Sequence, residues 1–239
     1  MSVSAIIPAY NEEERISGVI KILLEVEEID EILAVDDGSE DNTSCAALAA
    51  GAQVLTLEQN HGKAYAMLVG AQEAKNDILL FMDADLLGLE KRHIEGLVGP
   101  VLRQEADMSM GVFSSGRAFT DLAHFVSPNL SGQRALSKEF FFRAAEDMED
   151  MEDLGYGIES QINNYAKKND WRITNVEFDG VSQVTKEEKL GFSKGMTARM
   201  KMYMNIFKTV GGRQKVAIKK GWYQIKDGLN LLNGDESEK

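Results

Sequence analysis

The sequence contains a single cysteine, Cys45, among 239 residues, so it can form neither an intrachain disulfide nor a cysteine-rich zinc site. It also lacks the roughly 18 consecutive apolar residues that a membrane-spanning helix needs. The first residues, MSVSAIIPAYNEEE, have no basic stretch before a long apolar run, unlike a secretion signal. We therefore expect a cytoplasmic protein.

Two glycine-rich phosphate-binding motifs are missing as well. A dinucleotide-binding fold needs G-x-G-x-x-G after its first strand, but this chain has PAYNEEE there, and Glu12 to Glu14 would repel a pyrophosphate. The motif G-x-x-x-x-G-K-[ST] is absent too. The histidines His61, His93 and His124 are scattered and suggest no metal cluster. A nucleotide-dependent dehydrogenase is thereby excluded, and any phosphate must be bound by another kind of site.

The net charge is −13, and it is unevenly distributed. Residues 184–226 hold eleven Lys or Arg against two Glu, a local charge of +9, which leaves −22 on the rest of the chain. Because the body is acidic, we expect no nucleic-acid partner. The basic segment can dock on this acidic body, or it can contact phosphate or an anionic membrane.

Short apolar, β-rich runs recur along the chain, and helical patterns separate the first five. Such alternation predicts an α/β fold with one Rossmann-like, mostly parallel sheet flanked by helices. With 44% hydrophobic residues the chain can bury one sizeable core, so we expect one main domain. Residues 12–27 are expected to form one of the helices. The predicted strands are 3–8, 31–36, 52–57, 77–83, 107–113 and 173–178.

Polar residues follow each of the first four strands, where ligands bind in an open parallel sheet. The run ILLFMDADLLGLE places Asp83 and Asp85 after the fourth strand, and residues i and i+2 leaving a strand project to one side. Two converging carboxylates suit a hard cation such as Mg²⁺ or Mn²⁺, which can bridge a diphosphate. The alternative is an aspartate that caps the next helix, but the polar ends of the neighbouring strands favour the metal site.

Four segments in this order resemble the donor-binding half of family 2 glycosyltransferases with the GT-A fold: AIIPAYNEEERI, ILAVDDGSEDNT, NHGKAYAMLVG and LLFMDADL. Two later ones, LSGQRALSKEFF and LGYGIESQI, resemble the acceptor side of two branches. These branches are the polyprenyl-phosphate (dolichol-phosphate mannose synthase-like) and the glucosyl-3-phosphoglycerate synthase-like enzymes. The likeness covers roughly residues 2–208.

The resemblance implies roles on the donor side. Asp36 or Asp37 would accept the imide N–H of the base, although Asx-turn and helix-capping chemistry accounts for this DDG turn as well. Lys63 would approach the donor phosphates, unless it is a solvated lysine at a helix start. Asp83 and Asp85 would hold the metal ion. The nucleoside pocket would be lined by Pro8, Ala9, Tyr10 and Glu12.

In the later segments, Arg134 is expected to contact a phosphate of the acceptor or the donor, since a guanidinium fork suits phosphate oxygens; an ordinary surface arginine is the alternative. Glu159 follows two glycines and an aromatic residue, so its backbone can come close to a ligand, or it is simply a helix N-terminal acid. Asp153 is our candidate for the base that takes a proton from an acceptor hydroxyl. Many relatives complete the metal shell with a histidine where this chain has Gln183, whose oxygen can also bind Mg²⁺ or Mn²⁺.

These observations predict a metal-dependent glycosyltransferase that moves a sugar from a UDP- or GDP-linked donor to a phosphate-bearing acceptor, a polyprenyl phosphate or a small phosphorylated molecule. Family resemblance implies inversion at the anomeric carbon. The alternative is a non-catalytic nucleotide-sugar-binding or scaffold protein on the same fold. A homodimer is left open.

The expected organisation is a GT-A domain over residues 1–185, a basic amphipathic helical extension over 186–232 and a frayed tail over 233–239. Between residues 190 and 207, apolar side chains recur three or four apart with cations around them. This stripe can pack on the domain. Alternatively, residues 190–232 make a peripheral contact with the inner face of a membrane, which would favour a polyprenyl phosphate acceptor.

Overall fold

A computed structural model describes residues 2–113, 131–146 and 158–183 of the chain. The predictions for Asp153, for the helical extension and for the tail lie outside these residues. No helix within the described ranges is both long enough and apolar enough to cross a membrane.

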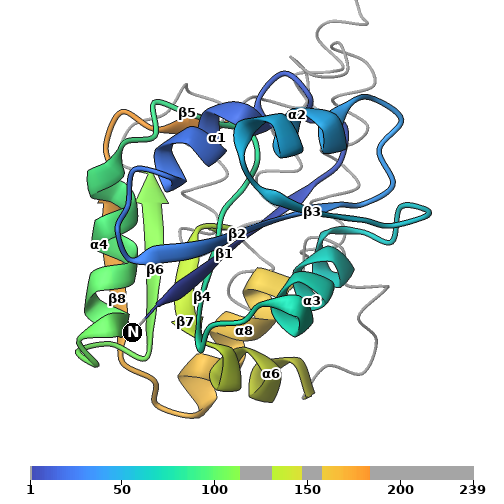
Figure 1. Cartoon of the computed structure of the whole chain (residues 1–239). Helices are drawn as coiled ribbons and strands as arrows, with labels where there is room; N and C mark the ends of the chain where they lie inside the picture. Colours follow the sequence, from blue (N-terminus) through green and yellow to red (C-terminus); the bar gives the residue numbers. More distant parts are fainter. Residues whose placement is uncertain (1, 114–130, 147–157, 184–239) are drawn as a thin grey trace, which may run out of the picture.

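The structure is built on a seven-stranded sheet with the order β3-β2-β1-β4-β7-β6-β8 (Figure 1). Strands β1 to β4 run parallel, β7 is antiparallel to both of its neighbours, and β8 is parallel to β6. A separate ribbon pairs β5, Leu86–Leu87, with β9, Ser182–Gln183. The sheet strands are β1 Val3–Ala9, β2 Ile29–Asp36, β3 Gln53–Thr56, β4 Ile78–Phe81, β6 Met108–Phe113, β7 Arg134–Ser137 and β8 Ile173–Phe178.

Helices cover both faces of the sheet, as expected for a fold with crossover connections. One layer holds α1 Ile16–Leu23, α2 Thr43–Ala50 and α4 Lys91–Leu102. The other layer holds α3 Lys63–Glu73, α6 Lys138–Glu146 and α8 Ile158–Lys168. Two buried hydrophobic clusters lie between these layers and the sheet.

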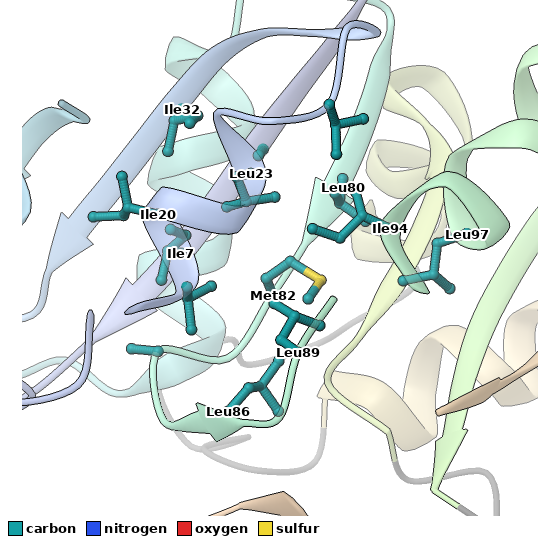
Figure 2. Close-up of a cluster of buried hydrophobic side chains, with 14 of the residues drawn as sticks. Ile7, Ile20, Leu23, Ile32, Leu80, Met82, Leu86, Leu89, Ile94 and Leu97 are labelled. Atoms are coloured by element: carbon teal, nitrogen blue, oxygen red, sulfur yellow. The ribbon is translucent and has the colours of Figure 1, made fainter. Parts of the chain in front are cut away.

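The first cluster fixes the segment that leaves β4. Met82, Leu86 and Leu89 turn into the core between α1 and α4, beside Ile20 and Ile94 (Figure 2). All five are less than 9% exposed. Burying side chains of this size contributes about 1.5–3 kcal/mol each. The polar residues between these anchors are therefore held in place by the core on both sides.

Close packing of α3 against the sheet depends on Gly70. A Cβ atom there would lie 2.4 Å from a methyl carbon of Ile6 on β1 and 3.0 Å from one of Val35 on β2. These neighbours belong to buried strands and cannot move aside freely. Because Gly70 has no side chain, α3 can pack this close to the sheet. This packing places Lys63, the first residue of α3, near the strand ends.

The predicted mostly parallel α/β sheet is confirmed, with three differences. All six predicted strands form, but the fourth ends at Phe81 rather than at residue 83. The antiparallel strand β7 and the ribbon of β5 and β9 were not predicted. The first helix spans Ile16–Leu23 rather than residues 12–27, because Glu12 to Glu14 belong to the preceding turn, where backbone bonds such as Ile16 N–H to Glu12 C=O begin the helix.

The packing of α3 can be tested with two glycine-to-alanine variants. We expect Gly70→Ala to lower the free energy of unfolding by about 1–3 kcal/mol, because the added methyl overpacks the interface with the sheet. Gly18→Ala in α1 is the matched control, since no atom of the described residues lies within 4 Å of its added Cβ. Alanine favours a helix over glycine, so this control should gain about 0.5–1 kcal/mol. Urea denaturation measures both, and equal stability of the two variants would contradict the packing.

Candidate functional site

The ends of β1 and β2 lie side by side at the carboxyl edge of the sheet, with Ala9 paired to Asp36. The Asp37 N–H donates to the Ala9 carbonyl at 2.8 Å, which keeps the two chains together beyond the strands. Pro8 pairs with Val35 one step earlier. The residues predicted to surround a nucleoside therefore lie at the adjacent, hydrogen-bonded ends of these two strands.

The two loops that follow are joined by hydrogen bonds. The Asn11 N–H donates to Ser39 Oγ at 2.9 Å, and the Glu12 N–H donates to Thr43 Oγ1 at 2.8 Å. Glu12 is 8% exposed and pairs with Arg15 at 3.2 Å. Tyr10, in contrast, is 42% exposed. Of the predicted pocket residues, Tyr10 is thus the one whose side chain is most available to a ligand.

Asp36 and Asp37 are buried and both accept hydrogen bonds from the protein. Asp36 accepts from the Ser39 N–H at 3.0 Å and from the Ser44 hydroxyl. Asp37 accepts the N–H groups of His61 and Gly62 at 2.8 Å each. Burial raises the pKa of Asp37, and these two donors oppose the shift only in part. The turn chemistry considered for the DDG sequence therefore operates, and the contact with a base remains a prediction.

Asp83, Lys63 and Glu159 form a charged cluster at the centre of this edge. The Lys63 Nζ lies 2.6 Å from Asp83 Oδ1 and 2.6 Å from Glu159 Oε1. Gln133 Nε2 donates to Asp83 Oδ2 at 2.7 Å, and Gln183 Nε2 donates to the same oxygen. The side chains of Asp83 and Lys63 are only 15% and 18% exposed. Residues far apart in the sequence are thereby brought together as the resemblance implied.

Gly132 makes room for this cluster. A Cβ atom at this position would fall 2.5 Å from both carboxylate oxygens of Asp83 and 2.6 Å from Lys63 Nζ. Any larger residue would displace the ion pair. The backbone of the loop before β7 therefore serves as one wall of the site.

Arg134 lies beneath the cluster and has no exposed surface. Its guanidinium donates to the Ser131 carbonyl at 2.5 Å, to Asn163 Oδ1 at 3.3 Å and to the Glu159 carbonyl at 3.4 Å. Burial lowers the pKa of Arg134, while the Glu159 and Asp83 carboxylates oppose that shift. These bonds tie the first turn of α8 to the loop before β7. The phosphate contact expected of Arg134 remains a prediction, and the observed contacts are those of a positioning residue.

Two buried polar atoms at the site, Arg134 Nε and Glu159 Oε2, have no hydrogen-bond partner among the residues that the structure describes. Leaving a buried charged group unsatisfied costs about 1–3 kcal/mol or more, so such atoms are uncommon. Glu159 itself is 5% exposed. Its second carboxylate oxygen is available to accept a hydrogen bond from a ligand that enters beside Lys63.

The acidic residues fit a hard divalent cation. Mg²⁺ is commonly held by one or two carboxylates and takes its other ligands from water and substrate phosphates. Asp83 presents carboxylate oxygens, which are hard ligands, next to the backbone of Gly132. Asp85 lies in the turn that leads to β5. Because β4 has ended before Asp83, this turn rather than strand alternation sets the position of Asp85. Gln183, paired with Leu86, lies next to Asp83, and a half-turn of its amide would present the oxygen.

Within the described ranges no group of three His, Cys, Asp or Glu side chains gathers as a metal cage. A site of two carboxylates completed by phosphate oxygens does not require one. The sequence reasoning missed Gln133 and Gly132, although both belong to the SGQR motif that singled out Arg134. Proximity to that motif was the only signal available for them.

A cavity of about 480 Å³ lies at the opposite, amino edge of the sheet, and its lining includes Lys75, Asn76, Asp107 and Arg172. Charged groups that line this cavity are paired within the protein. Arg172 lies 2.7 Å from Asp107, and Lys75 lies 3.1 Å from Glu31. Ligands of open α/β sheets bind beyond the carboxyl ends of the strands, so we place the candidate site at the charged cluster instead.

The profile of glycosyl transferase family 2 matches residues 4–156 of the chain. Among characterised proteins, the glucosyl-3-phosphoglycerate synthase of Mycolicibacterium paratuberculosis is 34% identical over 110 residues, 42% of this chain and 33% of that protein. The 4,4'-diaponeurosporenoate glycosyltransferase of Staphylococcus haemolyticus is 37% identical over 110 residues, 44% of this chain and 29% of that protein. The match thus spans about a third of these relatives.

Solved structures extend the likeness. Glucosyl-3-phosphoglycerate synthase from Mycobacterium tuberculosis with Mn²⁺, UDP and glucosyl-3-phosphoglycerate has a TM-score of 0.62 and 26% identity, covering 77% of this chain and 72% of that one. The same enzyme with Mn²⁺, UDP-glucose and phosphoglyceric acid has a TM-score of 0.60 and 26% identity over the same shares. The fold predicted from the motifs is therefore confirmed.

The charges of the cluster predict a pH-dependent effect of Lys63→Met. Burial alone would raise the pKa of Asp83, but the Lys63 ammonium and the two glutamine amides outweigh it, so the pKa is lowered. A lowered pKa stabilises the fold above the unfolded value of about 4 and loses that contribution as pH falls through the folded value. Without Lys63, burial dominates, and Asp83 favours the fold only while it is protonated.

Lys63→Met should therefore destabilise the protein by about 3 kcal/mol at pH 7, the lower end of the cost of breaking a buried ion pair, and by clearly less at pH 4. Guanidinium denaturation at both pH values measures the difference. Lys91→Met is the control, because its exposed pair with Glu95 should contribute less than about 1 kcal/mol. A cost of Lys63→Met that stays constant or grows toward pH 4 would contradict this electrostatic account.

Proposed function

Because the chain belongs to glycosyl transferase family 2, we propose that it transfers a sugar from a nucleoside-diphosphate sugar to a phosphate-bearing acceptor, with Mg²⁺ or Mn²⁺ as cofactor. The structural relatives support this choice, since the M. tuberculosis enzyme has been solved with Mn²⁺, UDP-glucose and phosphoglyceric acid. We accordingly expect a UDP-linked sugar to be the donor, with GDP-linked sugars as the alternative.

The proposal rests above all on the charged cluster at the carboxyl edge of the sheet, where the Lys63 ammonium lies 2.6 Å from Asp83 Oδ1 and 2.6 Å from Glu159 Oε1. A departing nucleoside diphosphate develops negative charge, and fixed cations stabilise it best in a site with little water. Lys63 supplies one such cation. Asp83 and Asp85, with the Gln183 oxygen, would hold the metal ion, which supplies Lewis-acid stabilisation of the leaving diphosphate when bound.

The other residues take roles that match their positions. Pro8, Ala9, Tyr10 and Glu12 border the nucleoside, and Asp36 or Asp37 faces the base. Glu159 Oε2, buried and without a partner in the described part of the chain, accepts a hydroxyl of the sugar or the acceptor. Arg134 orients Glu159 from below through its carbonyl bond and adds positive potential near the phosphate groups. Asp153 remains our candidate base for an acceptor hydroxyl.

Two kinds of phosphate-bearing acceptor fit this reaction. A small phosphorylated molecule such as 3-phosphoglycerate is favoured by the ligands of the solved relatives. A polyprenyl phosphate presents the same phosphate chemistry on a lipid chain, and it would agree with a peripheral membrane contact through residues 190–232. A transfer assay that offers both acceptors with UDP- and GDP-linked sugars separates them. Hydrolysis of donor without any transfer would contradict the proposed reaction.

Replacement of Asp83 by asparagine tests the catalytic role of the cluster. Asp83→Asn should lower kcat/KM by about 10²-fold or more, because the carboxylate that positions the metal and Lys63 is lost. Asp77→Asn is the matched control: it makes the same change at the exposed start of β4, at the other edge of the sheet. Steady-state rates with Mn²⁺, and again after EDTA treatment, provide the measurement. Full activity of Asp83→Asn, or of the wild type in EDTA, would refute the assignment.

A further inference from the structure

The Lys63 ammonium competes with any cation that binds Asp83. Lys63 is the first residue of α3, and its Nζ lies 2.6 Å from Asp83 Oδ1 and from Glu159 Oε1. The backbone just before Lys63 is held in place, because Asp37 accepts the two N–H groups that precede the helix. This ion pair neutralises the charge of the carboxylate that a metal ion would use.

The remaining acceptor capacity of Asp83 is small. A carboxylate has about four lone-pair sites on its two oxygens. Gln133 and Gln183 donate to Oδ2, and Lys63 donates to Oδ1. The backbone of Gly132 lies against this carboxylate, since a Cβ there would fall 2.5 Å from both oxygens. A divalent cation that takes the remaining site on Oδ1 must therefore come close to the positive ammonium, in a site where little water screens the repulsion.

We infer that Lys63 makes cation binding depend on the nucleoside diphosphate: the metal ion binds weakly while the ammonium remains on Asp83 and Glu159, and tightly once a diphosphate draws the ammonium away. The flexible lysine stem allows the move, and phosphate oxygens offer the ammonium another anionic partner. The metal ion and the ammonium would then each have an anionic partner instead of competing for Asp83. This inference rests on the proposed function, because it assigns the donor phosphates to Lys63.

Such a mechanism requires reciprocal coupling between the two ligands. If UDP strengthens the binding of Mn²⁺, then Mn²⁺ strengthens the binding of UDP by the same factor. Removing the charge of Lys63 should strengthen the binding of Mn²⁺ alone and weaken the binding of UDP. The first change reduces the coupling, whereas loss of a purely structural lysine would weaken the binding of both ligands.

The test is a titration of the full chain with Mn²⁺, in which electron paramagnetic resonance measures the free ion, with and without saturating UDP. A protein-free titration of UDP corrects for the complex that the nucleotide forms with Mn²⁺ in solution. The variants are Lys63→Met and Lys63→Gln, which remove the charge, and Lys63→Arg, which keeps it. Lys75→Met is the control, because Lys75 pairs with the buried Glu31 at the other edge of the sheet. Circular dichroism verifies that each variant is folded.

We expect Lys63→Met and Lys63→Gln to bind Mn²⁺ without UDP at least about tenfold more tightly than the wild type, within the range of ordinary coupling energies. The enhancement by UDP should fall by a similar factor, while Lys63→Arg and Lys75→Met should behave as the wild type. If the wild type shows the UDP effect but the neutral variants bind Mn²⁺ alone no more tightly, the coupling role is wrong and the proposed function stands. If no protein binds Mn²⁺ even with UDP, both are wrong.

Discussion

The ion pairs between the Lys63 ammonium and the carboxylates of Asp83 and Glu159 are the interaction on which the site depends. They join the start of α3, the segment after β4 and the first turn of α8. A charged cluster with so little exposure is stable only when each ion has a partner, because desolvation of an unpaired ion costs several kcal/mol. The surrounding structure can be understood as the set of constraints that keeps these three charges together.

Each constraint has a separate physical origin. Gly70 lets α3 approach the sheet, and Asp37 holds the backbone in front of Lys63. The apolar anchors around Asp83 bury the chain on either side of it. Gly132 leaves space above the carboxylate, and Arg134 fixes the turn of α8 that carries Glu159. The positive charges of Lys63 and Arg134 balance the negative charges of Asp83 and Glu159. A divalent ion can thus enter together with a diphosphate without leaving a large net charge.

Much of this arrangement could be predicted from the sequence, because it follows from the ends of parallel strands. Runs of apolar residues located all six predicted strands, and the polar residues after them located Asp36, Asp83 and Lys63 at one edge. The resemblance to family 2 glycosyltransferases added Glu159 and Gln183, which no strand pattern could connect with Asp83. The structure brings both into contact with the same cluster.

What could not be predicted arose from tertiary packing. Strand β7 is only four residues long and begins with an arginine, so no apolar periodicity marks it. Its antiparallel insertion buries Arg134, so the alternative of an ordinary surface arginine is wrong. Gln133 and Gly132 have no chemical signature of their own, since their importance comes from lying against Asp83. Local sequence therefore located the site, whereas the burial of its residues required the fold.

The most direct test of the account is the position of a bound cation. Crystals grown with Mn²⁺ and UDP, measured at a wavelength where manganese scatters anomalously, would locate the ion independently of the protein atoms. We expect an anomalous peak about 2.0–2.6 Å from a carboxylate oxygen of Asp83, with diphosphate oxygens completing the shell and the Lys63 ammonium moved onto a phosphate. A peak bound elsewhere, with Lys63 still between Asp83 and Glu159, would contradict this assignment of the metal site and of Lys63.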